Sequence, residues 1–269
     1  MNIQDFLYMW RGKEMAPLTP KEAYLLDAID SRGEKYERAL LLLHGFASSP
    51  AVYRELLPAF TAYDAVVCPP LPGHGSSIAA FSNAKATDWL NAAHHACESL
   101  IKQYDNVDVL GLSLGGLLAC HLSEHFPLNH LYLLAPALAL KKNINLMLAG
   151  LTVLQSLGVK TLKNRAGNIQ SNQFHELTYR HLPLNAIRET LTLIKQFKFT
   201  PPHCPVDVFL GRFDAVVDSK RVGQYFNGLP NAQIHWLNHS AHVLPIDGDI
   251  EMLTHFFKHH AQKPSDQLL

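Results

Sequence analysis

Six short runs of apolar, β-prone residues recur along the chain, separated by longer segments with the apolar spacing of helices. The runs cover residues 38–46, 65–71, 107–113, 131–136, 206–211 and 233–237. Several are apolar on both faces, which is typical of parallel strands covered by helices on both sides. This alternation predicts an α/β fold with a mostly parallel, doubly wound sheet.

The segments between these runs carry helix signals at their ends. Residues 87–104 place apolar side chains on one helical face, with Thr87 as a candidate N-cap. Residues 114–126 stop before Pro127, where a helix is expected to end. Two further helices are expected, one from Asp218 or Ser219 to Gly228 and a last one beginning near Asp249.

One long segment, residues 139–204, interrupts the alternation and shows no clear strand. It holds an apolar stretch at 146–159 and then a helical pattern that includes Leu184, Ile187 and Leu191. A connection of this length inside a compact domain is usually functional or separately folded. The pattern therefore predicts a helical cap at 139–204, inserted into a core made of residues 1–138 and 205–269.

Composition excludes several classes of protein. The 269 residues contain 23 Lys and Arg against 23 Asp and Glu, so the chain has no general attraction for nucleic acid. Four cysteines without a C-x-x-C pair are interpreted as thiols of a reducing compartment. No signal peptide is recognised, and no run reaches the roughly 18 apolar residues of a transmembrane segment, so a cytoplasmic protein is expected.

The strongest local motif is Gly-Leu-Ser-Leu-Gly at 111–115, between an apolar run and a helical segment. A nucleophile on a tight strand-to-helix turn needs small neighbours two residues away on either side. Such a turn holds the hydroxyl of Ser113 clear of the sheet, near the positive end of the next helix. The alternative is a glycine-rich helix start in which Ser113 is only an N-cap.

A serine nucleophile needs a base, and the base needs an acid that orients it. On this kind of sheet the acid follows a late strand and the histidine lies near the end of the chain. Asp214 and His242 occupy those places. The alternatives are Asp207 or Asp218 for the acid and His239 for the base, while the other histidines are expected on the surface or in the core.

The end of the first strand carries Leu-His-Gly-Phe at 43–46, where backbone N–H groups can stabilise an oxyanion. We expect these donors to be the N–H groups of Phe46 and Leu114. A second tight loop at 71–77 contains His74, which is expected to be structural. No His, Asp or Glu spacing such as H-E-x-x-H indicates a metal site.

Together these segments resemble the α/β-hydrolases, and more narrowly the bacterial carboxylesterases and monoacylglycerol lipases. The resemblance covers residues 38–260 and rests on LLLHGF (41–46), LPGHGSS (71–77), GLSLGG (111–116), GRFDAVV (211–217) and SAHVLPID (240–247). It implies a Ser113–His242–Asp214 triad, an oxyanion hole at Phe46 and Leu114, ester hydrolysis and no cofactor. Residues 1–37 lie outside it and are expected to hold a short helix and a leading strand. Ala241 stands where the family commonly has glycine.

The resulting hypothesis is a serine hydrolase that cleaves carboxylic esters through an acyl-enzyme on Ser113. Its partner would be a small-molecule ester with an apolar acyl chain, and part of 146–159 would line the acyl pocket. The alternatives are a thioesterase, an acyltransferase or a C–C hydrolase on the same triad, or a non-catalytic ligand-binding member of the fold. The motifs leave open the acyl length, the alcohol moiety and the oligomeric state.

Overall fold

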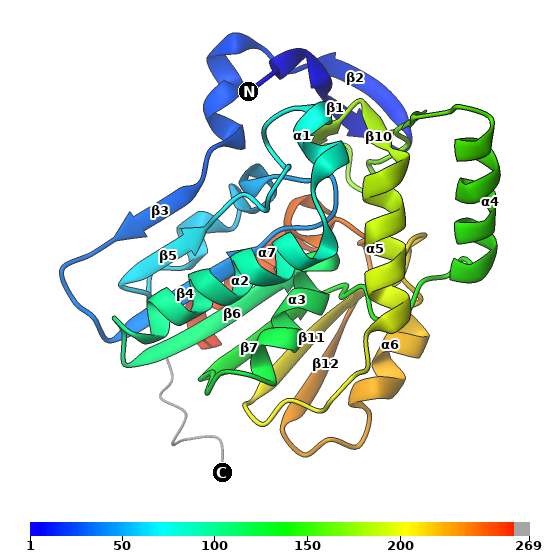
Figure 1. Cartoon of the computed structure of the whole chain (residues 1–269). Coiled ribbons are helices and arrows are strands. Elements are labelled where there is room, and N and C mark those ends of the chain that lie inside the picture. Colours follow the sequence, from blue (N-terminus) through cyan, green and yellow to red (C-terminus); the bar gives the residue numbers. More distant parts are fainter. Residues whose placement is uncertain (261–269) are drawn as a thin grey trace.

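The computed structural model describes residues 1–260, so residues 261–269 of the predicted second core part lie outside it. A seven-stranded sheet with the order β12-β11-β7-β6-β4-β5-β3 forms its centre (Figure 1). The six predicted runs correspond to β4 (Arg38–Leu43), β5 (Ala65–Cys68), β6 (Asn106–Leu112), β7 (His130–Leu134), β11 (Val206–Gly211) and β12 (Ala232–Leu237), and the last residues of four runs lie beyond the strand ends. These strands run parallel to one another, and the edge strand β3 (Ile29–Arg32) is antiparallel to β5. The predicted fold class is confirmed.

Helices cover both faces of this sheet. Helices α2 (Ala86–Ile101), α3 (Leu114–Ser123) and α6 (Ser219–Phe226) share one core cluster with Leu41 and Val109. Helix α7 (Ile250–His260) and the 3-10 helices Pro50–Tyr53 and Leu57–Ala59 share another with Leu40 and Leu110. Alternate residues of one strand therefore enter opposite layers, which explains why the runs are apolar on both faces.

The helix ends agree only in part with the sequence signals. Asp218 caps α6 by accepting a hydrogen bond from the N–H of Arg221, as expected. Helix α2 begins one residue before Thr87, and its N-cap is Lys85, whose N–H donates to the side chain of Asp88. The prediction of Thr87 as the cap is wrong because the carboxylate of Asp88 satisfies that helix end.

The predicted absence of strands from 139–204 is also wrong. This segment contains α4 (Ile144–Ser156), β8 (Thr161–Lys163), β9 (Glu176–Tyr179), β10 (His181–Pro183) and α5 (Leu184–Gln196). The three strands are three or four residues long, and all three residues of β8 are solvent-exposed to some extent. Strands this short show no clear alternation in sequence, so only their pairing partners reveal them.

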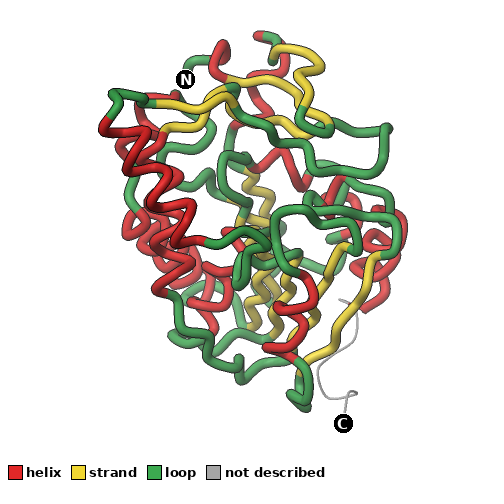
Figure 2. The backbone as a smooth tube through the Cα atoms, turned by 90° about the vertical axis from the view of Figure 1, so that its right-hand side faces the viewer, coloured by secondary structure: helices red, strands yellow, loops and turns green. Residues whose placement is uncertain are grey.

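The first 37 residues hold more strands than expected. Besides 3-10 turns, they form the hairpin of β1 (Phe6–Trp10) and β2 (Lys13–Pro17), and then β3. Strand β1 pairs with β9, so the chain start and the inserted segment share one small sheet. With α1 (Ile78–Asn83), this sheet lies beyond the carboxyl ends of the central strands, at the top of Figures 1 and 2.

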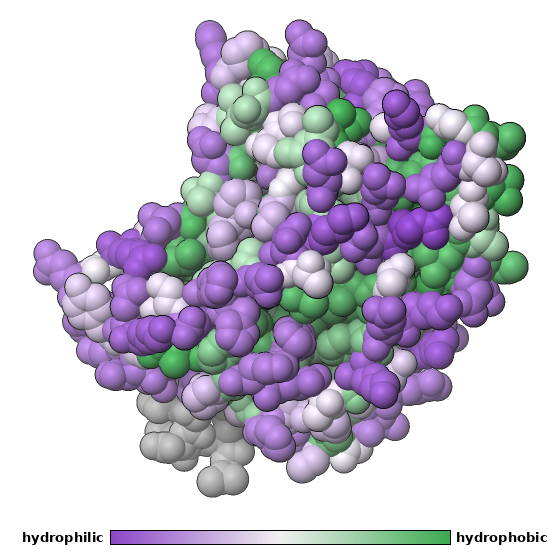
Figure 3. Space-filling view, viewed as in Figure 1, coloured by the Kyte–Doolittle hydropathy of each residue, from purple (hydrophilic) through white to green (hydrophobic). Residues whose placement is uncertain are grey.

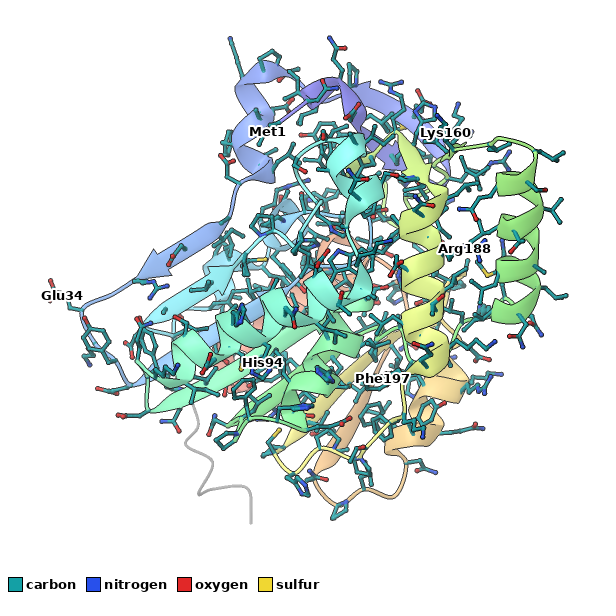
Figure 4. All side chains as sticks on the ribbon, viewed as in Figure 1. Met1, Glu34, His94, Lys160, Arg188 and Phe197 are labelled. Atoms are coloured by element: carbon teal, nitrogen blue, oxygen red, sulfur yellow. The ribbon has the colours of Figure 1, made fainter. Side chains whose placement is uncertain are left out.

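The apolar stretch at 146–159 packs mainly on α5. Leu151 of α4 is buried against Leu184 and Leu191, and Arg188 of α5 donates to Gln155 Oε1 at 2.6 Å (Figure 4). Leu146 of α4 and Leu157, just after this helix, are exposed, and Figure 3 shows apolar surface at the right, where α4 lies. This apolar stretch therefore joins the two helices of the inserted segment to each other rather than to the central sheet.

Two further features concern the whole described chain. All four cysteines are free thiols, and only Cys204 is partly exposed. Within residues 1–260, no helix is both long and apolar enough to cross a membrane.

Candidate active site

Ser113 lies on a sharp turn between β6 and α3. Its backbone has φ 54° and ψ −113°, a left-handed conformation that a residue with a side chain rarely adopts. A Cβ at Gly111 would lie 2.7 Å from the Cα of Gly116, and one at Gly115 would collide with the carbonyl of Leu43. The turn therefore requires glycine on both sides of Ser113, as the motif predicts.

A continuous chain of hydrogen-bonding side chains joins the three sequence-predicted residues. Ser113 Oγ lies 3.0 Å from His242 Nε2. The other ring nitrogen, His242 Nδ1, lies 2.8 Å from Asp214 Oδ2. With Nδ1–H donating to the carboxylate, Nε2 is left as the acceptor for the Ser113 hydroxyl. This is the tautomer that a histidine base needs.

The carboxylate of Asp214 is buried and anchored by the backbone. Its Oδ1 accepts hydrogen bonds from the N–H groups of Val216 and Val217, at 2.7 and 2.8 Å. These bonds leave Oδ2 aimed at His242.

The competing candidates have other contacts. Asp207 lies within β11 and bonds the Nε2 atoms of His130 and His235, at 2.7 and 2.6 Å. Asp218 caps α6. The backbone N–H of His239 donates to Asp249. Within residues 1–260, none of these groups forms a hydrogen bond to Ser113 or to the ring of His242, so the structure brings together Ser113, Asp214 and His242.

His242 is held as a stronger base than a free histidine. Burial alone lowers its pKa, but the charge of Asp214, the hydrogen bond to Asp214 and the charge of Glu176 outweigh burial and raise the pKa above its ordinary value. The protonated ring of His242 is thus stabilised by two nearby carboxyl groups.

The predicted oxyanion donors lie beside Ser113. The N–H of Leu114 is at the start of α3, and that of Phe46 is in the loop after β4. Neither N–H donates to an acceptor among residues 1–260. Both residues line the same cavity as Ser113, so two backbone donors remain available to a bound oxyanion.

An apolar cavity of about 440 Å³ opens next to Ser113. It is bounded by α4, by α5 and by the loop that follows β7, with Met147, Leu151 and Leu191 among its lining residues. Its only polar side chains are those of Ser113 and Thr190. A site of this kind suits an apolar chain whose reactive end lies at the serine.

Three residues at the site escaped the sequence analysis. Glu176 is buried, burial raises its pKa, and its Oε2 accepts the N–H of Gly167 at 2.6 Å. Asn168 contacts the loops of both Asp214 and His242 through its main-chain and side-chain oxygens. Asp247 is buried and accepts from the N–H of Ala241. Only Asp247 carried a signal, its place within the SAHVLPID motif.

Three further motif residues, two histidines and one alanine, have structural explanations. His44 and His74 are buried neighbours, with the N–H of Leu71 donating to His44 Nε2 at 3.0 Å and burial lowering the pKa of both rings, that of His44 to about 4. Ala241 is buried and is not at positive φ, so alanine in place of glycine causes no backbone strain there.

Residues 1–260 contain no group of three or more His, Cys, Asp or Glu side chains arranged to hold a metal ion. The chemistry described below uses only protein groups.

The profile of the alpha/beta hydrolase family matches residues 40–249, which is most of the chain and includes every site residue above. The chain belongs to this family. Among solved structures, this alpha/beta hydrolase is similar to one from a study of LipS and LipT, two metagenome-derived lipolytic enzymes. The TM-score is 0.79 and the identity 26%, covering 89% of this chain and 98% of the other.

Curated relatives of this alpha/beta hydrolase include lipolytic enzymes. It is 29% identical over 231 residues to a thermostable monoacylglycerol lipase of Bacillus sp. (strain H-257), covering 82% of this chain and 91% of the relative. It is 21% identical over 224 residues to a carboxylesterase of Bacillus subtilis (strain 168), covering 81% and 89%. These similarities support ester hydrolysis.

Proposed function

We propose that this protein hydrolyses carboxylic esters through an acyl-enzyme on Ser113, and that residues 139–204 form a cap that shapes its acyl pocket. The observation that carries the proposal is the chain of contacts from Ser113 Oγ through His242 to Asp214, with its serine end in an apolar cavity. Ser113, His242 and Asp214 are within hydrogen-bonding distance of one another in that order, so each can act on the next.

Acylation begins when His242 Nε2 takes the proton of Ser113 and the serine oxygen attacks the ester carbonyl. The carbonyl oxygen becomes an oxyanion and accepts hydrogen bonds from the N–H groups of Phe46 and Leu114. The imidazolium of His242 then gives its proton to the leaving alcohol. Collapse of the intermediate breaks the C–O bond and leaves the acyl group on Ser113.

Deacylation repeats these steps with water. His242 takes a proton from a water molecule, the resulting nucleophile attacks the acyl-serine, and the proton returns to Ser113 Oγ as the acid leaves. Throughout, Asp214 holds the ring of His242 in one tautomer and offsets its positive charge. The two hydrogen bonds from Val216 and Val217 keep that carboxylate in place.

Covalent labelling tests this assignment most directly. A fluorophosphonate should add its phosphonyl group to Ser113, identified by peptide mass spectrometry, and should stop turnover of aryl esters. Substrate panels should include monoacylglycerols and acyl thioesters, because the same triad can act on both. Labelling without turnover of any ester would instead indicate a ligand-binding member of the fold.

The pH dependence of kcat/KM should show a rising limb. His242 accepts a proton only when neutral, so activity increases as pH rises through its pKa. Because the neighbouring carboxyl groups raise that pKa, the midpoint should lie above about 6.5, the ordinary value for histidine. A rate independent of pH between about 5 and 9, with unfolding excluded by circular dichroism, would contradict a histidine base.

Acyl length should control kcat/KM through the apolar cavity. Each buried methylene contributes up to about 0.8 kcal/mol, so each added carbon should raise kcat/KM up to about fourfold until the cavity is filled. Medium-chain esters should then be preferred to acetyl esters. The measurement is kcat/KM for p-nitrophenyl esters of increasing acyl length.

Gly150→Phe should lower this chain-length limit. Gly150 is in α4 and lines the cavity, and a Cβ there would meet no atom within 4 Å. The ring can fill the acyl site without disturbing the packing of α4, whereas deleting α4 would uncover Leu184 and Leu191. Acetyl hydrolysis should be spared, and the outward-facing Val153→Leu should keep the wild-type profile. An unchanged profile in Gly150→Phe would remove α4 from substrate selection.

A further inference from the structure

A single stretch of the inserted segment, residues 164–178, contacts three of the four loops that carry the proposed catalytic groups; the fourth is the turn with Ser113. The three are the loop after β4 with Phe46, the loop after β11 with Asp214, and the loop after β12 with His242. With each loop the stretch forms at least one hydrogen bond to a main-chain atom. We call residues 164–178 the bridging stretch.

Asn168 joins the acid loop to the base loop. Its main-chain oxygen accepts hydrogen bonds from the N–H groups of His242 and Val243, at 3.0 and 3.3 Å. Its side-chain Oδ1 accepts the N–H of Ala215, the residue after Asp214, at 2.8 Å. Asn168 therefore holds both backbones, in addition to the direct hydrogen bond from the N–H of Phe213 to the carbonyl of Ser240 at 3.0 Å.

Thr178, at the other end of the bridging stretch, holds the oxyanion loop. Its buried Oγ1 donates to the carbonyl of Ala47 at 2.9 Å and accepts from Asn164 Nδ2 at 3.1 Å. Ala47 follows Phe46 directly and has φ 59°, a strained conformation that needs support from its surroundings. The orientation of the Phe46 N–H is tied to this bond.

The N-terminal hairpin keeps the bridging stretch in place. The N–H groups of Arg11 and Gly12, at the hairpin turn, donate to the carbonyls of Gly167 and Ala166 at 2.6 and 2.8 Å. The guanidinium of Arg11 donates to the carbonyl of Ile169. Strand β1 pairs with β9, where Leu7 lies opposite Thr178. The first residues of the chain thus support the stretch that contacts the catalytic loops.

The geometry points to Asn168 and Thr178 as positioning residues: Asn168 aligns Asp214 with His242, and Thr178 aligns the Phe46 N–H with the substrate oxyanion. This inference rests on the proposed function. A displacement of about 1 Å at such groups can cost on the order of 10²-fold in rate. Neither side chain is assigned any contact with substrate.

For Asn168 the test is Asn168→Ala, with Gln170→Ala as the matched control. Among residues 1–260, the Gln170 side chain forms a hydrogen bond with Arg11 alone, in an exposed part of the same stretch. Asn168→Ala should lower kcat about tenfold or more, with KM for a short aryl ester within about twofold. Its melting temperature should match that of the control, since the N–H of the exposed Ala215 can bond to water instead.

The pH profile separates positioning from a merely structural role. His242 is faced by Asp214 and Glu176, and both raise its pKa. If Asn168→Ala loosens the Asp214 contact, the rising limb of kcat/KM should move to lower pH. Asn168→Asp keeps an acceptor oxygen and adds negative charge, so kcat should recover at high pH while the limb moves to higher pH.

The role of Thr178 is tested by two substitutions, one that keeps the shape of the side chain and one that keeps its hydroxyl. Thr178→Val keeps the shape of the side chain but loses both hydrogen bonds, so kcat should fall about tenfold without a shift of the rising limb. Thr178→Ser retains the hydroxyl and should restore kcat. If Asn168→Ala and Thr178→Val keep wild-type kcat and pH profile while Ser113→Ala is inactive, the positioning inference is wrong and the proposed function stands. Activity retained by Ser113→Ala would reject the proposed function itself.

Discussion

Ser113→Ala should lower kcat for aryl ester hydrolysis by about 10⁴-fold or more. Alanine removes the oxygen that forms the acyl-enzyme, and His242 and Asp214 then have no nucleophile to activate. The fold should persist, because the Ser113 contacts to Leu134 and Ala137 are made by main-chain atoms. Steady-state kinetics and the melting temperature, measured on one preparation, separate loss of catalysis from loss of folding.

Ser49→Ala is the matched control for this variant. Ser49 is buried in the loop after β4, and its hydroxyl has no hydrogen-bond partner among residues 1–260. Removing it should change kcat by less than about threefold and should leave fluorophosphonate labelling intact. A loss of less than about tenfold in Ser113→Ala would assign the nucleophile to another residue.

His242→Ala should be about as damaging as Ser113→Ala, whereas His239→Ala should be mild. Alanine at 242 keeps the N–H that donates to Asn168, so its loop should stay in place while the base is lost. His239 is three residues away, and it contacts Asp249 through its backbone N–H, which alanine also retains. The comparison therefore isolates the imidazole in one loop.

The double variant Ser113→Ala/His242→Ala sharpens the result. If the two side chains act as one unit, its residual kcat should be close to that of either single variant. Additive losses would mean that His242 acts independently of Ser113. A larger loss in His239→Ala than in His242→Ala would identify His239 as the base.

The central sheet could be predicted because local and tertiary preferences agree there. Runs such as 206–211 are short, β-prone and apolar on both faces, and a buried parallel strand is what satisfies all three properties. The cap of α6 at Asp218 follows from a local hydrogen bond to Arg221. Both predictions depend on a few neighbouring residues.

The candidate site could be located for a related reason. Ser113, Asp214 and His242 follow β6, β11 and β12, and the carboxyl ends of parallel strands meet at one edge of a sheet. Strand order along the chain was therefore enough to place three distant residues near each other. The glycines at 111 and 115 marked the turn because no side chain fits beside it.

The sequence by itself thus determined the strand-helix core and the residues at its carboxyl edge, since their side chains record burial and turn geometry. Only the tertiary structure decided the small sheet of β1, β2 and β9 and the contacts of Asn168. Strand β2 is wholly exposed, so its sequence needs no apolar alternation. Asn168 accepts its hydrogen bonds from main-chain N–H groups, which nearly every residue type supplies. Such contacts exist only once the folded chain brings 168, 215 and 242 together.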